Sequence, residues 1–402
     1  MPFRLMMFAS TVLLLASASH AGDWPRFRGP AHNGVSDEKG WVPWGAGGPK
    51  VAWKAQAGVG FSSFVVAGGR VFTLGYADDA DTVVCLDADT GKALWQHTYP
   101  SELGDKFFEG GTTGTPTVDG DRVYVLSRWG DAFCLDAASG KVVWSKNIQK
   151  EHGVRVPSWG FGGAPLVHEN VLLLNAGDAG LGLDKATGKL LWKSADKDAG
   201  YSTPLPAKFG GQTVALLGSA QSYVAVDPRT GKEAWRIRWV TQYGVNAADP
   251  VVDGDRVLVS SGYGKGAGLF KVAAPEPKEL WKSKVLRSQM NAAVLVDGHL
   301  YGADGDTTNR EAALKCVALE TGTEKWAVPG FGTGTVVAAD GKLIALSAAG
   351  ELSVAPATPD GFKPVAKAQV LDGKCWSAPV LANGRIYCRN WRGQIVCLDV
   401  RK

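Results

Sequence analysis

Several features that would point to a particular partner are missing from this sequence of 402 residues. The 43 Lys and Arg residues nearly balance the 39 Asp and Glu residues, so the formal net charge is only +4. A charge this small gives no basic surface for nucleic acid or for an anionic membrane. No apolar run reaches the ~18 residues of a membrane-spanning helix. We therefore expect no nucleic-acid partner and no membrane span.

Metal and nucleophile motifs are also absent. The six cysteines include no adjacent pair and no Cys-x₂-Cys spacing, and the six histidines form no cluster. Zinc sites need such spacings, so we expect no metal site. No Gly-x-Ser-x-Gly segment marks a nucleophile elbow, and no catalytic residue is predicted. The first cysteine is Cys85, which excludes lipid attachment at a new N-terminal cysteine.

The N-terminus has the features of a secretory signal. Arg4 precedes an apolar run over residues 5–16, and Ser19 and Ala21 occupy the −3 and −1 positions of a cleavage site. That run is too short to span a bilayer as a helix, although an uncleaved anchor is the alternative. We predict a signal peptide over residues 1–21, a tail over 22–44 and one domain over 45–402. The protein is then exported to the periplasm or the medium.

Glycine and tryptophan are abundant, with 52 and 15 copies, and the tryptophans recur at regular intervals. Intervals between 42 residues (53 to 95) and 49 residues (95 to 144) separate the series Trp53, Trp95, Trp144, Trp192, Trp235, Trp281 and Trp326. Four copies end an Asp-x-x-(Thr/Ser)-Gly-Lys-x-x-Trp segment, at Trp95, Trp144, Trp192 and Trp235. The Asp is suited to accept turn N–H groups, and the Gly to adopt the positive φ of a bulged hairpin. We expect each indole to pack on the neighbouring unit.

Each repeat contains four short strand patterns joined by hairpin signals. Eight units begin near residues 62, 112, 162, 201, 246, 290, 333 and 376. The last unit has only three strands, whereas residues 50–55 form a fourth strand with no preceding three. The sequence therefore predicts an all-β fold: an eight-bladed β-propeller of four-stranded antiparallel blades, closed by the N-terminal strand. The seventh unit lacks the Trp, and residues 364–366 are its candidate fourth strand.

Four cysteines, Cys85, Cys134, Cys316 and Cys397, occupy the same place in the third strand of their units. A two-residue turn at 392–393 would place Cys388 directly opposite Cys397, and the matching pair in unit two would be Val125 and Cys134. A pair of core thiols and a cross-strand disulfide are both compatible with this placement.

A ligand site is expected where the first strand of each blade begins, at the mouth of the central channel. Aligning the units on Pro116, Pro204, Pro250 and Pro379 and stepping back three residues gives a ring of eight. It consists of Phe61, Thr113, Gly162, Tyr201, Ala247, Asn291, Gly334 and Trp376. Trp159, Asn246 and Arg389 are added as neighbours of this ring. Aromatic and polar groups of this kind suit a flat organic ligand, a sugar or a peptide, unless the aromatics plug the channel as core.

The repeat resembles the PQQ-like (quinoprotein-dehydrogenase-like) β-propeller family. The four Asp-x-x-(Thr/Ser)-Gly-Lys-x-x-Trp copies carry the resemblance. Segments 23–36 (DWPRFRGPAHNGVS), 260–267 and 371–390 resemble a subgroup of secreted bacterial members. The resemblance spans essentially all of the chain after the signal segment, and it is specific for the fold more than for the chemistry.

Two functions follow from the resemblance. Some members are alcohol dehydrogenases that hold pyrroloquinoline quinone and Ca²⁺ against a disulfide of adjacent cysteines, and another relative is a lipoprotein scaffold of outer-membrane assembly. This chain lacks the adjacent cysteines, and the predicted ring holds no charged residue to balance the three carboxylates of the quinone, unless Arg389 or Lys265 reaches it. We therefore expect a monomeric, non-catalytic propeller without a cofactor that binds a small molecule, sugar or protein. A quinone-dependent alcohol or sugar dehydrogenase is the alternative.

Overall fold

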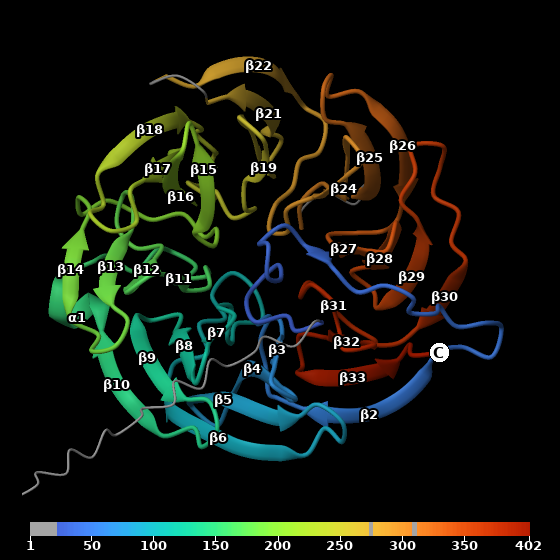
Figure 1. Ribbon diagram of the computed structural model, residues 1–402, viewed down its shortest axis with the longest axis horizontal. Coiled ribbons are helices and arrows are strands. Elements are labelled where there is room, and N and C mark those ends of the chain that lie inside the picture. The colour runs from blue at the N-terminus through green and yellow to red at the C-terminus, as the bar shows by residue number, and fades with distance from the viewer. Residues whose placement is uncertain (1–21, 273–275, 308–311) are drawn as a thin grey trace, which may run out of the picture.

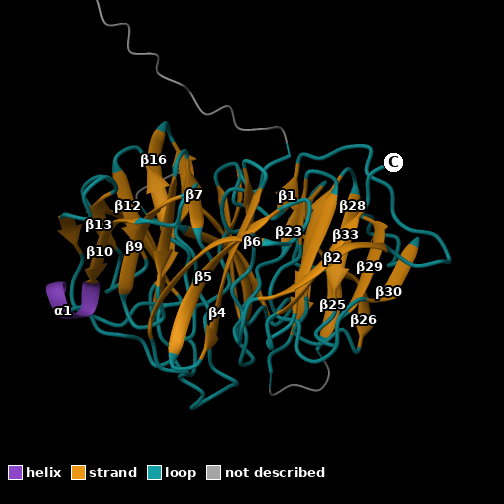
Figure 2. Cartoon of the chain, turned by 90° about the horizontal axis from the view of Figure 1, so that it is seen from below, coloured by secondary structure: helices purple, strands orange, loops and turns teal. Residues whose placement is uncertain are grey.

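A computed structural model describes residues 22–272, 276–307 and 312–402, and these residues form a ring of eight blades (Figure 1). The predicted signal peptide, 1–21, lies outside the described residues. Viewed from the side, the ring is a thick disc with loops on both faces (Figure 2). No helix among the described residues is long and apolar enough to cross a membrane.

Every blade contains four antiparallel strands, which in blades one to seven follow one another in the chain from the centre outward. Blade one contains β3 (Val65–Ala67), β4 (Arg70–Ala77), β5 (Ala80–Asp87) and β6 (Ala93–Pro100). Blade two contains β7 (Thr117–Asp119), β8 (Arg122–Leu126), β9 (Asp131–Asp136) and β10 (Val142–Asn147), followed by α1 (Ile148–His152). Blade three contains β11 (Leu166–His168), β12 (Val171–Leu174), β13 (Leu181–Asp184) and β14 (Leu190–Lys193). Blade four contains β15 (Leu205–Phe209), β16 (Gln212–Gly218), β17 (Ser222–Val226) and β18 (Glu233–Arg238).

The second half of the ring repeats this order. Blade five contains β19 (Val251–Asp253), β20 (Arg256–Ser261), β21 (Gly266–Lys271) and β22 (Lys278–Ser283). Blade six contains β23 (Val294–Val296), β24 (His299–Asp304), β25 (Ala313–Ala318) and β26 (Glu324–Pro329). Blade seven contains β27 (Thr335–Ala339), β28 (Lys342–Leu346), β29 (Glu351–Pro356) and β30 (Ala366–Gln369), with β1 (Val35–Ser36) added parallel to β27. Blade eight contains β31 (Val380–Ala382), β32 (Arg385–Arg389), β33 (Gln394–Asp399) and β2 (Lys50–Gln56).

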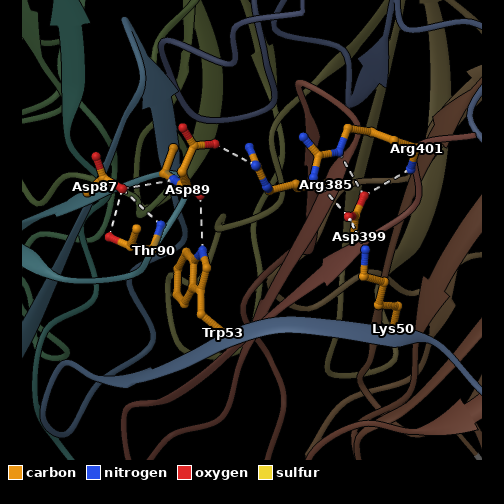
Figure 3. Close-up of polar contacts among 9 residues, drawn as sticks. Lys50, Trp53, Asp87, Asp89, Thr90, Arg385, Asp399 and Arg401 are labelled. Carbon is orange, nitrogen blue, oxygen red and sulfur yellow. Dashed lines mark hydrogen bonds and ion pairs between the residues drawn. The ribbon is translucent and has the colours of Figure 1, made fainter.

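The predicted closure is confirmed, because β2 pairs antiparallel with β33 as the outer strand of blade eight. Figure 3 shows the polar contacts at this junction. Asp399 on β33 pairs with Lys50 on β2 at 3.1 Å and with Arg401 at 2.8 Å. Arg385 of blade eight pairs with Asp89 of blade one at 2.5 Å. The chain thus joins its two ends within blade eight, where β2 covers the edge that β33 would otherwise leave open.

The recurring tryptophans hold adjacent blades together, as the repeat predicts. The Nε1 of Trp53 donates to the carbonyl oxygen of Ala88 in blade one at 3.0 Å (Figure 3). In the same way, Trp95 donates to the carbonyl of Ala137 in blade two at 3.0 Å. Corresponding bonds to the next unit are made by Trp144, Trp192, Trp281 and Trp326. Each indole lies over the turn that follows the third strand of the next blade.

The aspartates of the repeat cap these turns. Asp87 Oδ1 accepts from the backbone N–H of Thr90 and from its hydroxyl, both at 2.8 Å, and these bonds lower the pKa of Asp87. Gly91 follows with φ +70°, and a Cβ there would lie 2.6 Å from the ring of Trp53. The turn therefore needs glycine both for its backbone and for the indole that covers it.

The predicted cysteine pairing is wrong by one residue. Cys388 lies opposite Val396, and Tyr387 lies opposite Cys397, because the loop between the paired residues 390 and 394 has three residues instead of two. A shift of one residue turns a side chain to the other face of the sheet. All six cysteines are buried free thiols. The same error applies in blade two, where Cys134 faces Tyr124 instead of Val125. The fourth strand of blade seven also begins later than expected, at Ala366.

Residues 23–38, predicted as part of a tail, lie across one end of the central channel. Trp24 exchanges two backbone hydrogen bonds with Val66 of blade one, at 2.7 and 2.9 Å. Arg28 Nη1 donates to the carbonyl of Ala292 in blade six at 2.9 Å. Glu38 accepts from the N–H of Gly384 in blade eight at 2.8 Å. This segment bridges opposite sides of the ring and covers the channel at that end.

Candidate functional site

A cavity of about 870 Å³ occupies the centre of the ring. Seven of the eight ring positions predicted from the sequence line it: Phe61, Thr113, Gly162, Tyr201, Ala247, Asn291 and Trp376. Trp159, predicted as a neighbour of the ring, lines it as well. The aromatic side chains therefore surround a cavity and do not fill the channel as core. Whether these residues bind a ligand stays a prediction.

Aromatic rings gather on separate sides of the cavity. Phe61 stacks on Trp376 with ring centroids 5.0 Å apart, and this pair joins blades one and eight. Trp159 meets Tyr201 edge to face at 5.9 Å. Burial raises the pKa of Tyr201 to about 12, so this phenol remains neutral at physiological pH. The walls thus offer ring faces and edges and no phenolate charge.

The two predicted polar ring members are already bonded to backbone. Asn291 Nδ2 donates to the carbonyl of Trp376 at 3.0 Å, and so spans from blade six to blade eight. Gly334 of blade seven, between them in the ring, does not line the cavity. Thr113 Oγ1 donates to the carbonyl of Phe161 in the next blade at 3.0 Å. Both side chains fix the shape of the cavity wall while their remaining polar atoms are available to a ligand.

Two predicted site residues lie elsewhere. Asn246 is fully buried, and its Nδ2 donates to the carbonyls of Ser219 at 2.8 Å and Trp239 at 2.9 Å. Arg389 is fully buried as well, and burial lowers its pKa to about 9. Its guanidinium donates to the carbonyls of Ser62, Leu74 and Gly58 at 2.7 to 3.1 Å. Both side chains join neighbouring blades and do not belong to the cavity lining, because their polar atoms satisfy backbone groups.

The sequence reasoning missed a carboxylate, Asp249, that lines the cavity. Its Oδ1 accepts from the backbone N–H of Thr203 at 2.7 Å. Burial raises the pKa of Asp249 to about 6, and the positive charge of Arg28 opposes this shift. Asp249 lies two residues beyond the ring position Ala247. Extending the alignment inward by two residues in every unit would have found it.

Loop residues complete the cavity mouth. Phe107 and Phe108, from the connection between blades one and two, line it together with Tyr243 and Tyr263. Lys374 also lines it, pairs with Glu109 and lies 4.7 Å from the centre of the Trp376 ring. These loops carry no repeating pattern, so the alignment of units gave no signal for them.

The covered end of the cavity is formed by the N-terminal segment. Phe27 lines the cavity from residues 23–38, which lie across the ring at that end. The loops that carry Phe107 and Lys374 precede first strands, and the loop that carries Tyr263 joins β20 to β21, so all three lie at the other end. The cavity is therefore recessed, with a mouth on one face of the disc.

Comparisons with known proteins agree on the fold. A family model described as outer membrane protein assembly factor BamB matches residues 35–113 and 82–328. No curated protein matches the chain. BamB from Moraxella catarrhalis superposes with a TM-score of 0.65 at 15% identity, covering 87% of this chain and 99% of that one.

Two solved dehydrogenases share the architecture. The quinohemoprotein alcohol dehydrogenase from Comamonas testosteroni has a TM-score of 0.68 at 15% identity, covering 96% of this chain and 82% of that one. A europium-containing methanol dehydrogenase has a TM-score of 0.68 at 13% identity, covering 91% and 89%. Identities this low establish the fold and leave the activity open. The family model spans well over half of the chain, and on that match the chain belongs to the PQQ-like β-propeller family that includes BamB.

Proposed function

We propose that this protein is an exported, monomeric, non-catalytic propeller that binds a small molecule in its central cavity. The observation that carries the proposal is the recessed cavity of about 870 Å³, lined by aromatic rings and a few polar groups. Ligand sites in proteins have this size and composition. Membership of a family described as an assembly factor supports a binding role, and the apolar segment over residues 5–16 supports export.

A quinone-dependent dehydrogenase is the competing function, and the charges of the lining do not fit it. Among the described lining residues only Asp249 and Lys374 are charged, and Lys374 is already paired with Glu109. A quinone with three carboxylates would meet no free cation there and would face the carboxylate of Asp249. Burying such charges unpaired costs more than ring stacking returns.

The two cations considered for the quinone, Arg389 and Lys265, are engaged elsewhere. Arg389 is buried between blades eight and one, and the Nζ of Lys265 lies 4.8 Å from the centre of the Trp239 ring. The described residues also contain no group of three or more His, Cys, Asp or Glu side chains that would hold a Ca²⁺ ion beside the quinone. The charged and metal-binding side chains near the cavity therefore favour a binding role over quinone chemistry.

A protein is the second class of partner that the sequence allows. The mouth is flanked by the loop of Phe107, which is 52% exposed, and by Tyr243, which is 55% exposed. A peptide can reach these rims. We favour a small molecule because most of the aromatic lining lies below the rim, where a folded partner has no access.

The test is recovery of a bound molecule from the protein purified from its own organism. Denatured samples are analysed by mass spectrometry for a stoichiometric small molecule. Gly162→Trp adds a ring to the cavity wall, and its Cβ would meet only Tyr201 at ordinary distances of 3.5 Å or more. Leu94→Trp, on the outer strand of blade one and 49% exposed, is the control. We expect the molecule to be lost in Gly162→Trp and retained in Leu94→Trp.

Equal amounts of the molecule in both variants would contradict the proposal. A second assay mixes the purified protein with pyrroloquinoline quinone, Ca²⁺ and an alcohol or sugar, and follows dye reduction. We expect no substrate-dependent reduction. Stoichiometric quinone binding with turnover would establish the dehydrogenase instead.

A further inference from the structure

A second ring consists of the residues that follow the first ring by two positions in the sequence. It is uncharged except in blade five. The members that line the cavity are Ser63, Thr115, Ala164, Thr203, Asp249 and Ala378. Five of these six are small, neutral residues. Asp249 is the only carboxylate among the described residues of the lining.

The side chains of this ring make one recurring hydrogen bond between blades. Thr115 Oγ1 accepts from the N–H of Ser63 at 3.0 Å, and Thr203 Oγ1 accepts from the N–H of Ala164 at 3.1 Å. Asp249 Oδ1 accepts from the N–H of Thr203 at 2.7 Å in the same way. A threonine hydroxyl makes this bond in two of the three cases. The fold therefore does not require a carboxylate at position 249.

The second oxygen of Asp249 has no hydrogen-bond donor among the described residues. Arg28 is the cation that acts on this carboxylate, yet its Nη atoms donate to the carbonyls of Ala292, Ala293 and Asn33 at 2.8 to 2.9 Å. No ion pair within 4.0 Å joins the two side chains in the described structure. A buried carboxylate with one free oxygen costs stability unless another group compensates it.

The cavity walls are suited to a positive charge. Phe27, Trp159, Tyr201 and Tyr263 line the same space, and aromatic faces attract cations through their quadrupoles. Lys374 adds no net positive charge to the lining, because Glu109 neutralises it. A ligand without a donor group would leave Oδ2 of Asp249 unbonded, and an anion would be repelled by the carboxylate.

We propose that the cavity selects a small organic cation whose ammonium group donates to Oδ2 of Asp249, while its apolar body packs against the aromatic walls. This inference rests on the proposed binding function and adds the chemical class of the ligand. Asp249 thus has two roles, since Oδ1 joins blade four to blade five and Oδ2 recognises the ligand.

The test uses three probes of nearly equal shape and different charge: 2-phenylethylamine, 2-phenylethanol and phenylacetate. Binding to the full chain is measured by calorimetry at about pH 8, where Asp249 is ionised and the amine is protonated. We expect the amine to bind about tenfold or more tightly than the alcohol, which is typical of a buried charge pair, and phenylacetate to bind weakest.

Asp249→Thr introduces the residue that blades two and four carry at this position, and it retains an oxygen for the N–H of Thr203. This variant should bind the amine and the alcohol equally. Asp249→Asn provides a second neutral variant of the same shape if the threonine does not fold. Leu94→Trp, on the outer strand of blade one and away from the cavity lining, is the control and should keep the preference for the amine.

Three outcomes would overturn the inference: equal binding of all probes by the natural protein, a preference that survives in both Asp249 variants, or no binding of the amine at millimolar concentration. Equal binding that Gly162→Trp abolishes would refute the charge selection and leave the proposed function standing. The proposed function is judged separately, by the molecule recovered from the natural protein.

Discussion

The two ends of each repeating unit differ in how strictly their residues recur. The turn after the third strand is nearly identical in four units, where Asp caps it, Gly bends it and the neighbouring indole covers it. The ring before the first strand varies widely among the units, from Phe61 to Gly162 to Trp376. Each of these turns packs against the same kind of neighbour, an indole of the adjacent blade. Each cavity residue, in contrast, lines a different part of the central space. Uniform residues therefore mark assembly of the ring, and varied residues mark its candidate binding site.

The largest expected effect is at the outer turns. Trp53→Ala should lower the free energy of unfolding by about 3–5 kcal/mol, because it empties a packed site in the closing strand. Trp53 is only 7% exposed, whereas Val51 on the same strand is 46% exposed, which makes Val51→Ala the control. Denaturant unfolding gives both values. A loss below about 1 kcal/mol in Trp53→Ala would mean that the closing strand carries little of the ring's stability.

The turn glycine should matter next. Gly91→Ala places a methyl group 2.6 Å from the ring of Trp53 in a backbone with φ +70°, so we expect a loss of about 2–3 kcal/mol. Gly120 has a similar φ of +59° but no atom within 4 Å of its Cβ position. Gly120→Ala should therefore cost only about 1 kcal/mol, from backbone strain alone. Equal losses in thermal unfolding would show that the indole does not confine the turn.

Single residues of the second ring should contribute less to stability than the turn residues. Thr115→Val leaves the N–H of Ser63 without its acceptor, and we expect a loss of about 1–2 kcal/mol. Thr115→Ser keeps the hydroxyl and should unfold close to the natural protein. A Thr115→Val loss as large as that of Trp53→Ala would remove the distinction between the two ends of the repeat.

The smallest expected effect is a pH dependence at the closing strand. The bonds from Arg401 and then Lys50 hold the pKa of Asp399 well below its usual range. Because the folded pKa is depressed, the stabilisation is complete above the unfolded pKa of about 3.9 and is lost as the pH falls below it. Asp399→Asn should unfold with a shallower acid dependence than the natural protein over that range. An unchanged slope in acid titrations would show that the ion pair does not stabilise closure.

The sequence by itself determined the blade number, the closing strand and most of the first ring, because each depends on a periodic local pattern. The spacing of Trp95, Trp144 and Trp192 is a property of neighbouring residues, and it predicts the positions of the strands between them. Counting from Pro116 and Pro250 then reached cavity residues in seven of eight units. Such counting is reliable because the strands of every blade pair through hydrogen bonds in the same arrangement.

Only the tertiary structure decided the register of single pairs and the charge of the cavity. Cys388 does not lie opposite Cys397 because the loop at 391–393 has three residues instead of two, and local sequence does not fix that length. Arg389 turned into the junction of two blades because backbone carbonyls on both sides accept its N–H groups. Phe27 entered the cavity because the segment before the repeats crosses the ring. These contacts join residues far apart in the chain, so they form only once the ring has closed.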